Sequence, residues 1–198
     1  MSSPIRFLVS AQRRITITIF PLLIFTIIAP LTVSCQRGAA EQDRGIENLR
    51  ELVKNASGRP AADDLTRIES RFPRTRTAAL AQFLKGYLYY SSQNYKDAIE
   101  ALDTQAISGM TALGDYAFFY RAESEAGNDV KRDARRDYVT VSSQYPDSLK
   151  TREAKLHAAE MAIALGDPAS AIKDLARMTE AKDAQAVLVT AQAHEAAG

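Results

Sequence analysis

The sequence between residues 81 and 102 reads AQFLKGYLYYSSQNYKDAIEAL. It predicts two short antiparallel helices joined by a tight turn at residues 92–94. Gly86 lies inside the first of these helices, at a position where glycine costs roughly 1 kcal/mol relative to alanine. That cost is explained if a neighbour approaches the helix closely at this point. We expect the neighbour to be Ala98 on the returning helix, with Leu102 filling the space beside the contact.

Small residues equivalent to Ala98 recur along the chain at intervals of 36 or 37 residues. The recurring alanines are Ala61, Ala98, Ala134 and Ala171. Large side chains lie four residues after them: Leu65, Leu102, Tyr138 and Leu175. Two further columns keep this register, with Leu49, Gly86, Ala122 and Ala159 twelve residues before each alanine, and Ile68, Gln105, Val141 and Met178 seven residues after it. One helical hairpin cannot bury its apolar face alone, so repeated hairpins indicate a stack in which each copy covers the next.

The intervals and residue sizes in these columns resemble those of tetratricopeptide-type repeats. We therefore predict an all-α fold, a tetratricopeptide-like helical hairpin solenoid over residues 45–198. The expected hairpins span residues 46–72, 81–102, 115–145 and 151–179, and a further first helix spans residues 184–198. No returning helix follows it, so we expect an uncovered apolar face, either because the chain is a fragment or because a partner covers it.

Local signals add detail to the third hairpin. Ser108-Gly109 is predicted to break the chain before it, and Asp115 to act as the N-cap of its first helix. Its returning helix mixes both signs of charge, which favours a solvated outer face over an anion-binding patch. The charged residues of this face are Asp129, Lys131, Arg132, Asp133, Arg135, Arg136 and Asp137.

The composition excludes several classes of function. The 198 residues are 46% hydrophobic and 25% charged, which are ordinary globular values. The formal net charge is +1, which gives no electrostatic argument for nucleic acid as a partner. A single cysteine excludes an internal disulfide and a cysteine-rich metal site. We therefore expect neither a metal nor another cofactor.

The N-terminal residues 1–35 have the layout of an export signal. The apolar stretch Ile15–Val33 carries no charge and follows Arg13-Arg14. It ends in Leu31-Thr32-Val33-Ser34-Cys35, which resembles the bacterial lipoprotein signal and implies lipidation of Cys35. The alternatives are an uncleaved transmembrane anchor, ordinary signal cleavage and a twin-arginine signal.

Each of these alternatives places the rest of the chain outside the cytoplasm, because positively charged flanks stay inside. Residues 36–44 are expected to be a short linker. In a Gram-negative cell, Gln36 after the cysteine resembles a signal for sorting to the outer membrane. We therefore expect a membrane-anchored protein on the periplasmic side.

Three motifs between residues 78 and 198 resemble one family of envelope proteins. They are residues 113–123 (LGDYAFFYRAE), 145–148 (YPDS) and 165–168 (LGDP). All three are similar to the N-terminal superhelical region of soluble lytic murein transglycosylases. The resemblance implies a helical superstructure that handles peptidoglycan. In that family cleavage belongs to a separate C-terminal lysozyme-like domain, which this sequence lacks, so the resemblance implies truncation before the catalytic domain.

No catalytic residue is predicted within the sequence. The metalloprotease, P-loop and nucleophile-elbow motifs are absent. His157 and His194 have no histidine partner at helical spacing and are interpreted as structural residues. Glu69-Ser70 resembles the motif around the transglycosylase acid but lacks the segment that shapes its groove. An enzyme acting through Glu69 therefore remains only a minor third hypothesis.

Aromatic residues concentrate on the first helices, which line the concave face in superhelices of this type. The family's concave positions fall here on Phe83, Tyr87, Tyr90, Phe119, Glu123 and Glu160. Ordinary packing between helices is the alternative role for each aromatic residue. We predict an exported binding or scaffold module, the non-catalytic part of a lytic transglycosylase that contacts peptidoglycan. The alternative is a stand-alone tetratricopeptide-repeat lipoprotein that acts as a protein–protein scaffold in the envelope.

Overall fold

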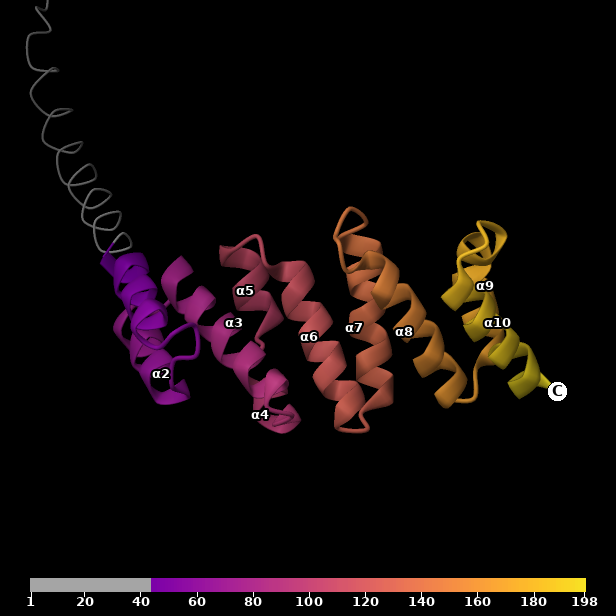
Figure 1. Cartoon of the computed structure of the whole chain (residues 1–198), viewed down its shortest axis with the longest axis horizontal. Helices are drawn as coiled ribbons and strands as arrows, with labels where there is room; N and C mark the ends of the chain where they lie inside the picture. The colour runs from indigo at the N-terminus through magenta and orange to yellow at the C-terminus, as the bar shows by residue number, and fades with distance from the viewer. Residues whose placement is uncertain (1–43) are drawn as a thin grey trace, which may run out of the picture. The chain divides into compact units, whose positions relative to one another are not determined.

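The computed structural model describes residues 44–198, and all regular secondary structure in this part is α-helical (Figure 1). The predicted all-α class is therefore confirmed. The described residues belong to a compact unit that spans Gln42–Gly198. Cys35 and the predicted signal segment lie outside the described residues. The helices are residues 44–55, α2 (Ala62–Arg71), α3 (Arg76–Ser91), α4 (Tyr95–Ala101), α5 (Thr104–Met110), α6 (Gly114–Gly127), α7 (Lys131–Gln144), α8 (Thr151–Ala164), α9 (Pro168–Glu180) and α10 (Ala184–Ala197).

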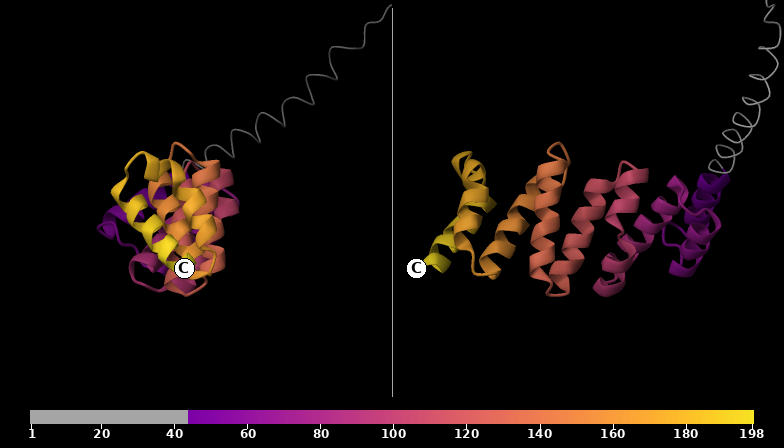
Figure 2. Two further views of the ribbon diagram at one scale, coloured as in Figure 1. Left: turned by 90° about the vertical axis from the view of Figure 1, so that its right-hand side faces the viewer. Right: turned by 180° about the vertical axis from the view of Figure 1, so that it is seen from behind.

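The described helices follow one another in a row from α2 to α10 (Figures 1 and 2), and most of them pack on the next helix in sequence; α4 and α5 instead each pack on α3 and α6. Among α2 to α10, the helix pairs in substantial contact are at most three elements apart in the chain. The apolar core is correspondingly divided into clusters along the row, each built from two to four adjacent helices. Because these contacts are local, side chains from a few neighbouring helices build each part of the surface.

The recurring columns of the sequence form the core of this row. Leu65, Leu102, Tyr138 and Leu175 are all fully buried, as are Ala98, Ala134 and Ala171. Gly86, Ala122 and Ala159 are buried at the equivalent points of the first helices. Ala61 is the exception, since it is exposed and precedes α2 as its N-cap residue.

The close approach at Gly86 is present, but its partner differs from the prediction. A Cβ atom added to Gly86 would lie 2.5 Å from Cγ of Leu102 and 3.3 Å from the Leu102 backbone nitrogen. The side chain of Leu102, rather than Ala98, therefore occupies the space that glycine leaves open. Ala98 lies one turn earlier on α4 and is buried as well.

Two local predictions between α4 and α6 were wrong. Ser108-Gly109 does not break the chain, because both residues lie inside the short helix α5. Asp103 starts this helix by accepting hydrogen bonds from the backbone nitrogens of Gln105 and Ala106, each at 3.1 Å. Asp115 is not an N-cap, since α6 already begins at Gly114 and the Asp115 carboxylate accepts a hydrogen bond from Ser148 Oγ.

The charged strip of α7 is only partly the solvated face that we predicted. Asp137 is 1% exposed and accepts a hydrogen bond from Nε of Arg121 on α6. Glu125, one turn after Arg121, is also buried beside this pair. Burial of Asp137 is possible because the guanidinium group compensates its charge inside the helix pair.

The last described helix, α10, buries one face and exposes apolar side chains on another. On α10, Ala186, Val189 and Ala193 pack into the last core cluster. The adjacent face carries Val187 and Leu188, which are 45% and 59% exposed. Across residues 44–198, no helix combines the length and the apolar character that crossing a bilayer would require.

Candidate functional site

Helices α3, α6 and α8 together present a continuous surface of aromatic and polar side chains, which we call the Tyr–Glu face. It consists of Tyr87, Tyr90, Tyr120, Glu123, His157 and Glu160. The ring of Tyr120 on α6 lies at its centre, with ring centroids 4.9 Å from Tyr87 and 5.1 Å from Tyr90 on α3. The helices bring these residues together because α3 and α6 pack directly on each other.

Glu123 joins the aromatic part of the face to the histidine. Its two carboxylate oxygens accept hydrogen bonds from the hydroxyl groups of Tyr138 and Tyr90, the latter at 3.4 Å. Nε2 of His157 lies 3.7 Å from Glu123 Oε1. Burial and the neighbouring Glu123 charge raise the pKa of Tyr90 to about 12, so that its hydroxyl remains a hydrogen-bond donor.

His157 lies among three carboxylates. Its Nδ1 is 2.9 Å from Glu160 Oε2, and its Nε2 is 3.9 Å from Glu153 Oε1 in addition to the contact with Glu123. The hydrogen bond to Glu160 raises the pKa of His157; burial opposes this effect, and the charges of Glu123, Glu160 and Glu153 add to it. The net direction favours the protonated imidazolium, which donates a hydrogen bond from Nδ1 to Glu160 and carries a positive charge near Glu123 and Glu153.

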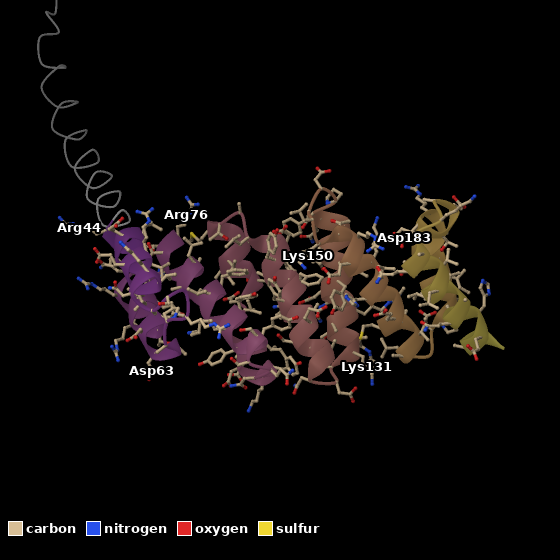
Figure 3. The ribbon with its side chains drawn as sticks, in the orientation of Figure 1. Arg44, Asp63, Arg76, Lys131, Lys150 and Asp183 are labelled. Atoms are coloured by element: carbon tan, nitrogen blue, oxygen red, sulfur yellow. The ribbon has the colours of Figure 1, made fainter. Side chains whose placement is uncertain are left out.

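Lys150, labelled in Figure 3, directly precedes α8, and its side chain lies beside the same surface. Its Nζ lies 4.3 Å from the centre of the Phe119 ring and 5.8 Å from that of Tyr120. The same nitrogen donates a hydrogen bond of 2.7 Å to Glu153. The face is therefore an interlocked network of charges and rings whose positions are set before any ligand binds.

A groove lies next to the Tyr–Glu face, between α8 and α10. Its volume is about 420 Å³. The side chains that line it are Leu149, Arg152, Glu153, Leu156, His157, Glu160, Gln185, Leu188, Val189 and Gln192. Arg152 and Asp183 bridge the two sides of this groove with hydrogen bonds of 2.7 and 2.9 Å. His157 and Glu160 belong to both the groove and the Tyr–Glu face, so the two surfaces are continuous.

Most of the predicted face residues come together, but Phe119 does not belong to their surface. Phe83, Tyr87, Tyr90 and Glu123 lie on or around the ring of Tyr120, and Glu160 is linked to them through His157. Phe119 is only 2% exposed and packs in the core against Tyr138. Its ring leaves no surface for a ligand, so the prediction that it lines the binding face was wrong.

Sequence reasoning missed one residue of the Tyr–Glu face and two residues that contact it. Tyr120, Tyr138 and Lys150 were not selected, and His157 was interpreted without its partners. A signal was present for the histidine, because Glu153 and Glu160 lie four residues before and three residues after it on the same helix face. No local sequence pattern predicts that Tyr138 contacts Glu123, because Tyr138 lies on α7 and Glu123 on α6.

Glu69, the acid of the third hypothesis, contacts Lys85 on α3. Its Oε1 is 2.8 Å from Nζ of Lys85, so the residue forms an ion pair between α2 and α3. Within residues 44–198, no three histidine, cysteine or acidic side chains are arranged to hold a metal ion. Compared with known proteins, the chain matches no family model, no curated protein and no solved structure.

Proposed function

We propose that this chain is an exported, non-catalytic module of tetratricopeptide-like helical repeats that binds another envelope macromolecule through the Tyr–Glu face. The observation that carries the proposal is the continuous row of rings and carboxylates contributed by α3, α6 and α8. Tyr87 is 38% exposed, and the Glu160 side chain is 43% exposed, so both are available to a ligand. A preorganised surface binds with little loss of side-chain entropy, because its side chains are already held by each other.

The repeat assignment is supported by the spacing of the buried alanines and of the large residues that follow them. Export and anchoring through Cys35 are supported by the sequence of residues 1–35. The proposal of export is separate from the proposal of a binding face, because the same arrangement of α3, α6 and α8 could form in a cytoplasmic repeat protein.

A polypeptide is the ligand that the neighbouring groove favours, because its apolar and charged lining suits protein side chains. Peptidoglycan is a second candidate, and the exposed tyrosine ring of Tyr87 favours it, because such rings stack on sugars. The resemblance to lytic transglycosylases points to the same ligand. In that case the chain would position glycan strands for a catalytic domain elsewhere.

The test uses the full chain in detergent and measures two kinds of binding. Retention on purified sacculi reports peptidoglycan binding, and crosslinking in solubilised envelope membranes reports protein binding. We expect one of them to occur and Tyr87→Ser to weaken it. Val139→Ser on α7 is the matched control, since Val139 is 41% exposed and lies beside a separate groove between α7 and α9. Absence of both kinds of binding, or equal loss in both variants, would refute the proposed function.

A further inference from the structure

The groove between α8 and α10 has the length and periodicity of a site for a helix. The residues of α8 that line it recur at intervals of three and four, from Arg152 through Leu156 to Glu160. Leu149 extends the same stripe by one turn at its N-terminal end. From Arg152 to Glu160 this spacing covers roughly two helical turns, or about 12 Å of α8, and Leu149 lies just before the helix. A partner helix laid along the stripe would therefore meet lining side chains over about two to three of its turns.

Apolar side chains in this groove are left uncovered by the packing of residues 44–198. Leu149 is 87% exposed and Leu188 is 59% exposed, although both line the same hollow. Leu156 and Val189 form the apolar floor between them and are almost fully buried. A ligand that brings apolar side chains to Leu149 and Leu188 removes this surface from water.

The charge around the groove is negative. Four carboxylates lie in it or at its edge, those of Glu123, Glu153, Glu160 and Asp183, against the two permanent cations Lys150 and Arg152. Lys150 and Arg152 are already paired, with Glu153 and Asp183 respectively. Even with His157 protonated, the carboxylates outnumber the cations by one, so the charge favours a cationic ligand over an anionic one.

We propose that this groove binds a basic amphipathic helix of a partner protein. The apolar side of that helix lies on Leu149 and Leu188, and a lysine or arginine beside it reaches Glu160. Helices with one apolar face commonly bind grooves between two other helices in this manner. The proposal rests on the proposed function as far as the ligand is a polypeptide, and it adds the chemistry and the position of that ligand.

The test uses the full chain in nanodiscs of a zwitterionic phospholipid and a fluorescent synthetic helix of 15 residues. The probe carries leucine at helical spacing on one face and lysine beside it. Fluorescence anisotropy measures its affinity, with empty nanodiscs as background. We expect Leu188→Ser and Glu160→Lys each to weaken binding by about tenfold, because each removes one of the two proposed contacts.

Matched controls separate these contacts from general effects. Val139→Ser changes an apolar residue of similar exposure outside the groove, and Glu195→Lys reverses an exposed charge on α10 outside the groove lining. Both variants should bind the probe like the wild-type chain. A second peptide with glutamate in place of lysine should bind at least about tenfold more weakly.

The proposal is overturned if the probe binds no better than to empty nanodiscs, if both groove variants bind it normally, or if the acidic peptide binds equally well. These results can be distinguished from failure of the proposed function. Ligand retention that depends on Tyr87 but not on Leu188 would leave the Tyr–Glu face standing and remove only the groove as a helix site.

Discussion

Replacing Glu125 with glutamine should stabilise the chain at neutral and alkaline pH. Glu125 is 5% exposed on α6, and its nearest cation is Arg121, with 3.9 Å between Oε1 and Nε. That guanidinium is already hydrogen-bonded to the buried Asp137. Burial, followed by the charge of Asp137, raises the pKa of Glu125 from its ordinary 4.5 to about 7, although Arg121 acts in the opposite direction.

The direction of the pH effect follows from which state binds the proton more tightly. Between pH 4.5 and 7 the folded chain keeps Glu125 protonated, whereas the unfolded chain has released this proton. The stability contributed by the protonated form is complete below the unfolded pKa and is lost as the pH rises through the folded pKa. A pKa difference of about 2.5 corresponds to about 3 kcal/mol, which is the expected change across this range.

Glutamine has nearly the same shape and does not titrate, so Glu125→Gln should remove this loss of stability. Urea unfolding followed by circular dichroism measures the free energy of unfolding between pH 5 and pH 8. Between pH 5 and pH 8, the free energy of unfolding of the variant should rise by about 3 kcal/mol relative to that of the wild-type chain. Glu195→Gln, at an exposed position of α10, is the control and should show no such gain. Parallel curves for the wild type and Glu125→Gln would refute the reasoning.

Other predictions concern packing, the buried ion pair and the histidine. Gly86→Ala should destabilise the chain, because overlap with Leu102 costs about 1–3 kcal/mol, which exceeds the gain in helix propensity. Gly109→Ala in α5 is the comparison, since a Cβ atom there meets no atom within 4 Å. It should raise the free energy of unfolding by about 0.5–1 kcal/mol. Equal effects of the two substitutions on thermal unfolding would contradict the close approach. Asp137→Asn should lower the free energy of unfolding by about 3–5 kcal/mol, since it removes the buried carboxylate to which Arg121 donates a hydrogen bond. Urea unfolding of this variant and of Asp174→Asn, an exposed substitution, tests this. A loss for Asp137→Asn no larger than that for Asp174→Asn would contradict it. An NMR titration should place the pKa of His157 above its ordinary value of 6.5, and Glu160→Gln should lower it because the strongest hydrogen bond to a carboxylate is removed; an unchanged value would show that Glu160 does not hold the ring.

The helical class, the turn at residues 92–94 and the burial of the large residues of the recurring column could be predicted from the sequence, because these features depend on residues close together in the chain. Ala98 and Leu102 are four residues apart, so they lie on the same side of the chain's helical turn, and the same spacing recurs in the other copies. Turn residues such as Gly166 and Asp167 end one helix and cap the next without help from distant parts.

Only the tertiary structure decided which side chains of adjacent helices meet. Phe119 and Tyr120 are neighbours in sequence, but one lies in the core and the other at the centre of the Tyr–Glu face. The sequence could not distinguish them, since a rotation of α6 by one residue, about 100°, exchanges their roles. Glu123 and His157 meet because α6, α7 and α8 pack in order, and Asp137 is buried because Arg121 faces it. The burial of a polar group depends on its partner, and that partner lies on another helix.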